Sequence, residues 1–373
     1  MLRIQPRRSL LLLIVSVSIV ESPVAGAADP VAKEPRIDWH DAQKLTVEGR
    51  GYTDVKEFYD RLPAKAEGVV RDAVWGLSRN SAGMCVRFRA DTTTIMVRWK
   101  LRSANLALPH MAATGASGID LYGLTDDGAW RWIAVGKPAG IETTVKLTSE
   151  LKPGLREYRV YLPLYNGVTS VEIGVPPGRK VEPSTDPALA RKPLVFYGTS
   201  IMQGACASRT GMAQSSIIGR RMNVPVINLG FSGNGLMEPE VAQLIAELDP
   251  AVFVLDCLPN MDAARVRQNA EAFIRSVRKA RPATPIVLVE DRTYADAFWS
   301  PTKHERNVMS RKEFRAIYER LVSEGMEGLT YVEGNQLLRA DGEDTVDGSH
   351  PTDLGFMRYA DVMEPILRPL LKN

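Results

Sequence analysis

Four short segments of the chain carry the residue types that acyl-transfer chemistry uses. They are Gly198-Thr199-Ser200, the loop from Asn228 to Gly235, Pro259-Asn260, and Asp347 to Pro351. Acyl transfer needs a nucleophile, a base within hydrogen-bond reach, a group that orients the base, and donors that face the developing oxyanion. Because the four segments together contain one of each, they indicate acyl transfer or ester hydrolysis.

Ser200 is the candidate nucleophile. It follows the apolar run that ends at Tyr197, and the intervening Gly198 permits a tight turn that would expose the hydroxyl at a sheet edge. A serine at this place is also typical of a helix N-cap, since its oxygen accepts a backbone N–H of the first turn. The segment alone leaves both roles open.

His350 is the candidate base. The chain has only four histidines, and this one follows Asp347 by three residues near the C-terminus. A carboxylate at that spacing can accept the Nδ1–H of the ring, which leaves Nε2 free to take the serine proton. The alternative is a surface turn before a helix, with Thr352 or Asp353 as its cap.

The other two segments offer hydrogen-bond donors. Glycines in the loop 228–235 let backbone N–H groups approach a ligand closely. Asn260 places a side-chain N–H donor directly after an apolar run. Both features also suit ordinary turns, because Gly230 and Gly235 are turn formers and Asn is common after Pro in turns.

A parallel sheet is the element that would bring these segments together. Five apolar runs alternate with segments whose apolar residues recur every three or four positions, as from Ala263 to Val277. The runs are Pro193 to Tyr197, Val224 to Leu229, Ala251 to Leu255, Ile286 to Val289 and Leu329 to Val332. This pattern predicts an α/β fold with helices on both faces of the sheet and its site at the carboxyl ends of the strands.

The first half of the chain has a different pattern. From about Leu45 to Val175 short segments alternate apolar and polar residues, as at Val86 and Phe88, which is typical of half-buried strands. Asp126-Asp127-Gly128 predicts one hairpin, and Asn166-Gly167 predicts another between Tyr158–Leu164 and Val168–Val175. With no long amphipathic helix in between, we expect an antiparallel β-sandwich. A Pro- and Gly-rich linker would follow, from 176 to 192.

Composition and the N-terminus bound the function classes. At 373 residues, with 45% hydrophobic and 24% charged residues and a net charge of +3, the chain is typical of a two-domain globular protein without nucleic-acid partners. A basic segment ending at Arg8, an apolar stretch from Leu10 to Val20 and Ala25-Gly26-Ala27 predict a cleaved signal peptide over residues 1–27. The alternative is an uncleaved anchor, although eleven residues span only about half of a roughly 30 Å hydrocarbon core. We therefore expect an exported, periplasmic or secreted protein with no stable membrane span after cleavage.

Three cysteines would then fold in an oxidising compartment. They are Cys85, Cys206 and Cys257, and the odd count leaves at least one unpaired. A disulfide between Cys206 and Cys257 is conceivable, since each is near a candidate site residue in the sequence. Burial as small apolar groups is the alternative that we favour.

The order of the four segments resembles that of the SGNH (GDSL-like) esterase and lipase superfamily. Ser, Gly, Asn and Asp-x-x-His follow one another from about Pro193 to the C-terminus. The first block reads Gly-Thr-Ser-Ile where Gly-Asp-Ser-Leu is usual. The third reads Leu-Pro-Asn-Met where Gly-x-Asn-Asp is usual. These departures keep the key residues and bear on the preference for acyl chain and leaving group.

The resemblance implies a role for each of five residues. Ser200 would be the nucleophile, with His350 as its base and Asp347 orienting that base. Gly233 and Asn260 would be oxyanion donors beside the Ser200 N–H. No cofactor and no metal are implied.

The sandwich also resembles part of that superfamily. The stretch from Pro109 to Tyr122, with Gly-Ile-Asp-Leu-Tyr, and Tyr161-Leu-Pro-Leu-Tyr-Asn166 are similar to a sandwich that precedes the catalytic domain in a bacterial SGNH subgroup. This implies a jelly-roll-like antiparallel domain over 35–180 and a three-layer, flavodoxin-like SGNH domain over 190–373. His110 would face the cleft between them or be a structural histidine.

The segment from Arg292 to Asn307 follows the fourth apolar run and is rich in aromatic residues, among them Tyr294, Phe298 and Trp299. Such residues stack on sugar rings or acyl groups, or they pack against their own domain. Glu290-Asp291-Arg292, where the run ends, would be a salt-bridged structural cluster or a substrate clamp.

Several SGNH enzymes with such a sandwich act on acetylated polysaccharides. The resemblance therefore implies a serine esterase that removes O-acyl groups, foremost O-acetyl groups, from carbohydrate or another small ester through an acyl-Ser200 intermediate. The alternatives are a lipase or thioesterase for longer acyl chains, and a glycan-binding protein that has lost catalysis. The five intact residues argue against the last of these, and the oligomeric state is left open.

Overall fold

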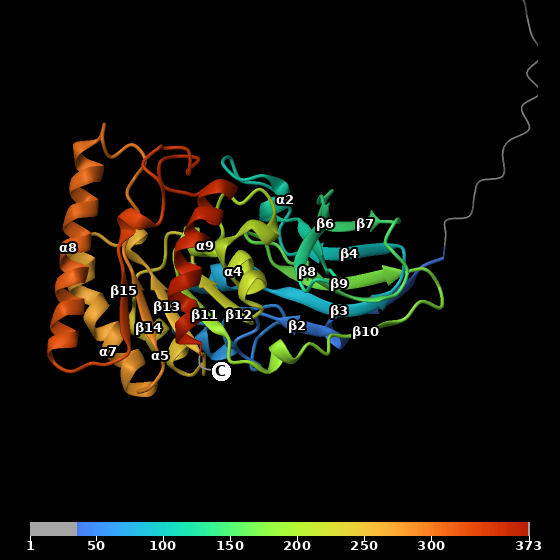
Figure 1. The fold of residues 1–373 in the computed structure, drawn as a ribbon, viewed down its shortest axis with the longest axis horizontal. Helices are drawn as coiled ribbons and strands as arrows, with labels where there is room; N and C mark the ends of the chain where they lie inside the picture. Colours follow the sequence, from blue (N-terminus) through green and yellow to red (C-terminus); the bar gives the residue numbers. More distant parts are fainter. Residues whose placement is uncertain (1–35, 372–373) are drawn as a thin grey trace, which may run out of the picture. The chain divides into compact units, whose positions relative to one another are not determined.

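The computed structural model describes residues 36–371. The signal peptide expected at 1–27 lies outside the described residues. From Arg36 onward the contacts form one compact unit, in which an all-β part precedes an α/β part along the chain (Figure 1). The domain ranges 35–180 and 190–373 stay a prediction.

A five-stranded parallel sheet forms the centre of the second half of the chain. Its strand order is β12-β11-β13-β14-β15. The strands are β11 (Leu194–Gly198), β12 (Val226–Gly230), β13 (Val252–Asp256), β14 (Ile286–Val289) and β15 (Leu329–Val332). Each of the five apolar runs forms one of these strands, so the prediction of a parallel sheet is confirmed.

Helices cover both faces of this sheet. In β11, Leu194 and Phe196 join the core under α3, α4 and α9, whereas Val195 and Tyr197 join the core under α5, α7 and α8. The helices are α3 (Ser200–Gln203), α4 (Gln214–Met222), α5 (Pro239–Ala246), α6 (Ala263–Arg265), α7 (Glu271–Ala280), α8 (Pro301–Ser323) and α9 (Asp353–Leu367). Alternating burial on two sides gives the three layers that the sequence predicts.

The helix expected from Ala263 to Val277 is interrupted. A π-helical stretch at Val266–Ala270 separates α6 from α7. Val266 and Ala270 nevertheless stay buried, so the apolar spacing that predicted the helix still describes its buried side. Such π-turns are frequent near functional sites, and this one follows the loop of Asn260.

The first half of the chain folds into two antiparallel sheets that share one core. The four-stranded sheet has the order β1 (Asp38–Asp41), β9 (Val168–Val175), β4 (Ile95–Leu101) and β7 (Glu142–Thr148). The six-stranded sheet has the order β10 (Val181–Pro183), β3 (Cys85–Asp91), β8 (Leu155–Tyr161), β5 (Ile119–Leu124) and β6 (Trp130–Gly136), with β2 (Thr46–Glu48) beside β3. Two short helices, α1 (Asp72–Ser78) and α2 (Ala113–Ala116), lie in the connections. The predicted antiparallel sandwich is confirmed.

One of the two predicted hairpins is wrong. Gly128, with φ +79°, turns the chain between the paired strands β5 and β6 as expected. The Asn166-Gly167 turn instead connects β8 to β9, which lie in different sheets. Asn166 is buried there, where its Nδ2 donates to the Ser103 carbonyl at 2.9 Å. A Cβ at Gly167 would lie 2.1 Å from the Arg79 carbonyl, so close packing accounts for the glycine.

The expected linker from 176 to 192 is anchored to the sandwich. It contains strand β10, which pairs with β3, and a 3₁₀ turn at Pro187–Ala190. Asp186 caps this turn and accepts a hydrogen bond from Arg87 at 2.6 Å. The connection between the two parts is therefore fixed by a buried arginine of β3.

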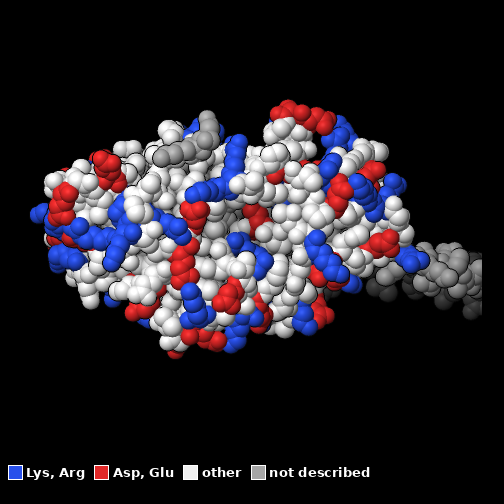
Figure 2. Space-filling model, turned by 90° about the horizontal axis from the view of Figure 1, so that it is seen from below, with Lys and Arg blue, Asp and Glu red and all other residues white. Residues whose placement is uncertain are grey.

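Charged residues of both signs are interspersed on the face shown in Figure 2. Across residues 36–371, the helices are all too short or too polar to cross a membrane.

Candidate active site

Ser200 stands at the end of β11, where the chain turns into the four-residue helix α3. Thr199 caps that helix, since its Oγ1 accepts the Ile201 N–H at 3.3 Å. The helix cap expected of Ser200 as an alternative is thus supplied by its neighbour. Gly198 is required because a Cβ there would lie 2.4 Å from the Asp256 carbonyl. The Ser200 side chain is free for another partner.

That partner is His350. Ser200 Oγ lies 2.8 Å from His350 Nε2, and His350 Nδ1 lies 2.7 Å from Asp347 Oδ2. The other carboxylate oxygen of Asp347 accepts the backbone N–H groups of Ser349 and His350 at 3.1 and 2.8 Å. The following helix, α9, is capped by Thr352. The structure therefore joins Ser200, His350 and Asp347 in one hydrogen-bonded chain.

The charge of Asp347 is held in place by this arrangement. Burial raises the pKa of its carboxyl group, but the hydrogen bonds from the His350 backbone and ring together outweigh burial and leave the pKa below its usual value. An ionised carboxylate at Nδ1 fixes the tautomer in which Nε2 can accept a proton and stabilises the imidazolium that forms.

The loop after β12 lies against the end of β11. The Phe231 N–H donates to the Gly198 carbonyl at 2.9 Å, and a Cβ at Gly235 would lie 2.4 Å from the same oxygen. The Gly235 N–H in turn donates to Asn260 Oδ1 at 3.3 Å. The segments of Ser200, Gly233 and Asn260 are thus tied to one another at the carboxyl edge of the sheet.

Three donors in these segments are unused. Within residues 36–371, the backbone N–H groups of Ser200 and Gly233 and the Nδ2 of Asn260 have no hydrogen-bond acceptor. Gly233 is exposed and has φ +69°, a left-handed conformation in which a glycine is favoured. Free donors around a serine nucleophile are the groups that would stabilise an oxyanion.

Sequence reasoning missed the buried polar side chains that hold this loop. Gln203 Oε1 accepts the Ser232 N–H at 3.0 Å, and Asn228 Oδ1 accepts the Gly230 N–H at 2.8 Å. Asn228 carried a usable signal, because it is a polar residue inside an otherwise apolar run. Arg61 carried none, yet its buried guanidinium donates to the carbonyls of Asn228 and Gly230 at 3.1 and 2.8 Å.

A histidine of the sandwich lies beside this site. The ring centroid of His110 lies 5.5 Å from that of His350, and the His110 side chain is exposed. The structure thus places His110 beside His350, where the sandwich meets the α/β part.

The three cysteines are buried free thiols. Cys206 therefore does not pair with Cys257, whose Sγ faces the Tyr197 carbonyl at 3.8 Å in the core. The interpretation of the cysteines as small apolar groups describes Cys85 and Cys257. Cys206 differs, because it lies beside His110 and His350.

Two aromatic residues stand out from the loop after β14. Phe298 and Trp299 are 86% and 81% exposed and pack edge to face, with their ring centroids 4.9 Å apart. The Ala295 N–H donates to the Gly348 carbonyl at 2.9 Å, which joins their loop to the loop of His350. They do not pack into their own domain.

The cluster Glu290-Asp291-Arg292 is structural. All three side chains are buried, and the two carboxylates form ion pairs with arginines of α8. Arg306 pairs with Asp291 and Arg315 pairs with Glu290, each at 3.2 Å. Arg306 also donates to the Pro259 carbonyl at 2.9 Å, so the cluster supports the loop of Asn260 from behind.

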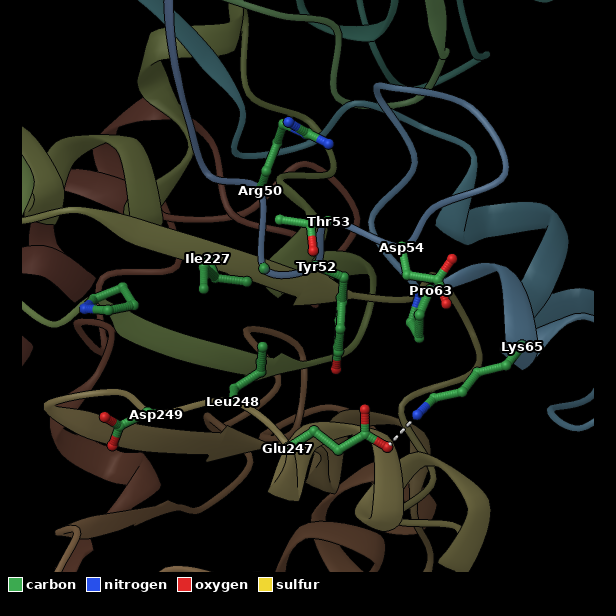
Figure 3. Close-up of a pocket in the computed structure, with 12 residues that line it drawn as sticks. Arg50, Tyr52, Thr53, Asp54, Pro63, Lys65, Ile227, Glu247, Leu248 and Asp249 are labelled. Carbon is green, nitrogen blue, oxygen red and sulfur yellow. Dashed lines mark hydrogen bonds and ion pairs between the residues drawn. The ribbon is translucent and has the colours of Figure 1, made fainter.

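A pocket of about 440 Å³ lies at the other end of the sheet. Figure 3 shows Tyr52, Ile227 and Leu248 around it, with Lys65 and Glu247 paired at 2.8 Å. Because parallel sheets place their chemistry at the carboxyl ends of the strands, this pocket is distinct from the site of Ser200.

Comparisons with known proteins agree with the geometry. A model of the GDSL-like lipase/acylhydrolase family matches residues 191–368, and a model of the N-terminus of SGNH-hydrolase-type esterases matches residues 37–181. A Bacteroides ovatus protein assigned as a GDSL-like lipase is 32% identical, with a TM-score of 0.86 over 90% of this chain and 98% of that chain. The chain belongs to the GDSL-like lipase/acylhydrolase family. Among curated proteins no sequence matches this GDSL-like protein.

More distant structures share the fold of this GDSL-like protein. The salicylyl-acyltransferase SsfX3 from a tetracycline biosynthetic pathway is 18% identical, with a TM-score of 0.70 over 91% of this chain and 98% of that chain. A family two carbohydrate esterase from Clostridium thermocellum, in complex with cellohexaose, is 16% identical, with a TM-score of 0.56 over 77% of this chain and 92% of that chain.

Proposed function

We propose that this protein, an ester hydrolase by family, is a serine esterase that removes O-acyl groups, foremost O-acetyl groups, from carbohydrate. The observation that carries the proposal is the chain of hydrogen bonds from Ser200 Oγ through His350 to Asp347, at 2.8 and 2.7 Å. Ser200 is the nucleophile, His350 is the general base, and Asp347 orients the ring.

In the first half-reaction, Ser200 Oγ attacks the ester carbonyl while His350 Nε2 takes its proton. The N–H groups of Ser200 and Gly233 and the Nδ2 of Asn260 stabilise the oxyanion. The carbon–oxygen bond to the alcohol then breaks, and His350 gives the proton to the departing oxygen. Water, deprotonated by the same ring, hydrolyses the acyl-serine and restores the free hydroxyl.

A carbohydrate as the alcohol is supported by the surface beside the catalytic loop. Phe298 and Trp299 present two exposed rings there, and aromatic faces pack against the apolar faces of sugar rings. The fold shared with family two carbohydrate esterases is consistent with this substrate. The same rings would also hold a long acyl chain, so a lipase or thioesterase is the second candidate.

Three variants test the catalytic assignment. Ser200→Ala should abolish hydrolysis of 4-nitrophenyl acetate, and His350→Ala should cost nearly as much. Asp347→Asn should retain more activity, since nucleophile and base remain. Circular dichroism of each variant serves as the folding control. If Ser200→Ala or His350→Ala kept most of the activity, the proposal would be wrong.

Two assays test the substrate. Nitrophenyl esters from acetyl to palmitoyl should show kcat/KM falling with chain length, and acetylated plant or bacterial polysaccharides should release acetate, with Ser200→Ala as the blank. A rise of kcat/KM toward palmitoyl would favour the lipase. Binding of polysaccharide without acyl release would favour a glycan-binding protein.

Export also remains a proposal. It is supported by the basic, apolar and small-residue order of residues 1–27. N-terminal sequencing of protein recovered from the periplasm or medium should begin shortly after Ala27. Recovery of the full-length chain from the cytoplasm alone would contradict export.

A further inference from the structure

Three metal-ligating side chains meet beside Ser200. His110, Cys206 and His350 each place one ligand atom within 4.8 Å of the other two. They come from the sandwich, from the loop after α3, and from the loop before α9. We propose that they form a binding site for a thiophilic divalent cation such as Zn²⁺, and that the bound ion blocks hydrolysis.

The donor set matches the ion. Zn²⁺ prefers thiolate sulfur and imidazole nitrogen in a tetrahedron, and a site with three protein ligands leaves the fourth position open. At Zn–N of about 2.0 Å and Zn–S of about 2.3 Å, the two nitrogens and the sulfur of a tetrahedral site lie about 3.3–3.5 Å apart. The observed spacing of up to 4.8 Å must therefore close by about 1 Å. Rotation of the exposed His110 side chain can supply that movement.

His350 is already oriented as a zinc ligand. Its Nδ1 is held by Asp347 at 2.7 Å, so Nε2 is the nitrogen that would bind the ion. A carboxylate behind a ligating histidine is the usual arrangement at protein zinc sites. Nε2 now accepts the Ser200 hydroxyl at 2.8 Å. An ion at Nε2 takes the same lone pair, so Ser200 loses its base.

Cys206 is the sulfur ligand. It has φ +71°, a left-handed conformation that only a few non-glycine residues adopt, and its side chain is nearly but not completely covered, at 8% exposure. Burial, together with the charge of Asp347, raises the pKa of the thiol to about 12, so the free protein carries the S–H form. Binding the cation forms the metal–sulfur bond and releases the thiol proton to water.

The other thiols and histidines provide controls. Cys85 and Cys257 are completely buried. Within the described chain no other group of three His, Cys, Asp or Glu ligands converges in this way. His304, on α8, is exposed like His110 but lies outside the cluster. Cys85→Ala and His304→Ala thus match the test variants Cys206→Ala and His110→Ala in chemistry but not in position.

Binding is measured first, without reference to catalysis. Titration with Co²⁺ should produce the thiolate-to-metal charge-transfer absorption in the wild type, and added Zn²⁺ should remove it. The band should be absent in Cys206→Ala. In His110→Ala it should appear with an affinity for Co²⁺ lower by at least about 10-fold. In Cys85→Ala and His304→Ala both the band and the affinity should be unchanged. No band in the wild type, or the same band in Cys206→Ala, would overturn the site.

Inhibition is measured second, and this part rests on the proposed function. Zn²⁺ should inhibit acetyl ester hydrolysis by the wild type and by both controls. Each activity is compared with that of the same variant in chelator. The inhibitory concentration should rise at least about 10-fold in Cys206→Ala and His110→Ala. Equal inhibition of all variants would overturn the site. Inactivity of the wild type on every ester would refute the proposed function and leave the Co²⁺ result standing.

Discussion

Thr199 occupies the place where the related first block usually has Asp. Its hydroxyl accepts the Ile201 N–H at 3.3 Å and so caps α3. Thr is a less favoured cap than Asp, but its side-chain oxygen can accept the same kind of backbone N–H bond. The departure from the usual block therefore keeps the cap, and with it the freedom of Ser200 to bond His350.

Asp256 gives a residue-scale prediction about pH. It ends β13, is completely buried, and accepts the Tyr359 hydroxyl at 2.8 Å. Burial raises its pKa to about 6, against the opposing charge of Arg292. The folded state thus holds this proton more tightly than the unfolded chain. The contribution of the Asp256 carboxyl group to the free energy of unfolding is fully present below about pH 4. It is lost as the pH rises to about 6, and it does not return at higher pH.

Asp256→Asn removes this titration. The free energy of unfolding of the variant, relative to the wild type, should rise by roughly 2 kcal/mol between pH 4 and pH 7. Urea unfolding of both proteins at the two pH values measures the change. An identical difference at pH 4 and pH 7 would show that Asp256 does not titrate in this range.

At the scale of elements, the junction of β11 with the loop after β12 decides the donor geometry. Both Gly233 and Gly235 lie in that loop, but a Cβ at Gly235 would lie 2.4 Å from the Gly198 carbonyl, whereas a Cβ at Gly233 meets nothing within 4 Å. Gly235 also holds Asn260 through its N–H. Gly235, which the sequence also fitted to an ordinary turn, thus sets the spacing between the segment of Ser200 and the segment of Asn260.

Gly235→Ala should therefore lower kcat for acetyl ester hydrolysis by about 10²-fold or more, the scale for losing one oxyanion donor. Gly233→Ala retains its backbone N–H and has room for the methyl group. Its cost is a left-handed residue, about 1–2 kcal/mol, which corresponds to roughly a 10-fold effect. Steady-state kinetics of the two variants compare them directly. Activity of Gly235→Ala equal to that of the wild type would show that the contact with Gly198 does not set the donor geometry.

Strand β5 joins the sandwich to the loop after α3. Asp120, in the Gly-Ile-Asp-Leu-Tyr segment, is buried and accepts Arg209 Nη1 at 2.6 Å, the Gly211 N–H at 3.0 Å and Trp132 Nε1 at 2.7 Å. A buried carboxylate with three donors from two elements fixes their relative position. The segment that resembled a subgroup motif thus serves the packing of the two parts.

Asp120→Asn should destabilise the fold by about 3–5 kcal/mol, the usual cost of leaving a buried charge or donor without its partner. The control is Asp126→Asn in the turn that follows β5, where the side chain is 87% exposed and the pair with Arg156 is on the surface. That variant should stay within about 0.5 kcal/mol of the wild type. Urea unfolding of both variants measures the difference. Equal stability of the two would show that the hydrogen bonds of Asp120 do not hold the sandwich to the loop after α3.

At the scale of the whole molecule, the sequence pattern predicted those features that are determined by residues close together in the chain. Apolar runs predicted every strand of the parallel sheet, and the order of four segments brought Ser200 and His350 together. Asn166-Gly167 led to a wrong prediction because its turn chemistry is local, whereas the buried hydrogen bonds of Asn166 join it to residues 63 and 49 positions away. Arg61 and the meeting of His110 with Cys206 were invisible for the same reason, since each depends on packing between the two halves.

The boundary between those halves is less simple than the sequence suggested. Residues between β2 and β3, which the sequence assigns to the sandwich, belong to the core of the α/β part. Tyr52, Leu62, Val70 and Val74 lie in the same apolar cluster as Ile227 of β12. The Tyr52 hydroxyl also donates to the Leu244 carbonyl of α5 at 2.8 Å. This segment therefore covers part of the apolar core of the α/β part.

A fragment of residues 190–373 should therefore not fold as the same residues do in the whole chain. Burying four side chains of this size contributes about 6 kcal/mol or more, which is comparable to the total stability of about 5–15 kcal/mol of a typical protein. The fragment should bind a hydrophobic dye, lack near-UV circular dichroism and lose ester hydrolysis, and the separate fragment 36–189 should restore part of that activity. Cooperative unfolding with full activity of 190–373 alone would show instead that the covering segment is dispensable.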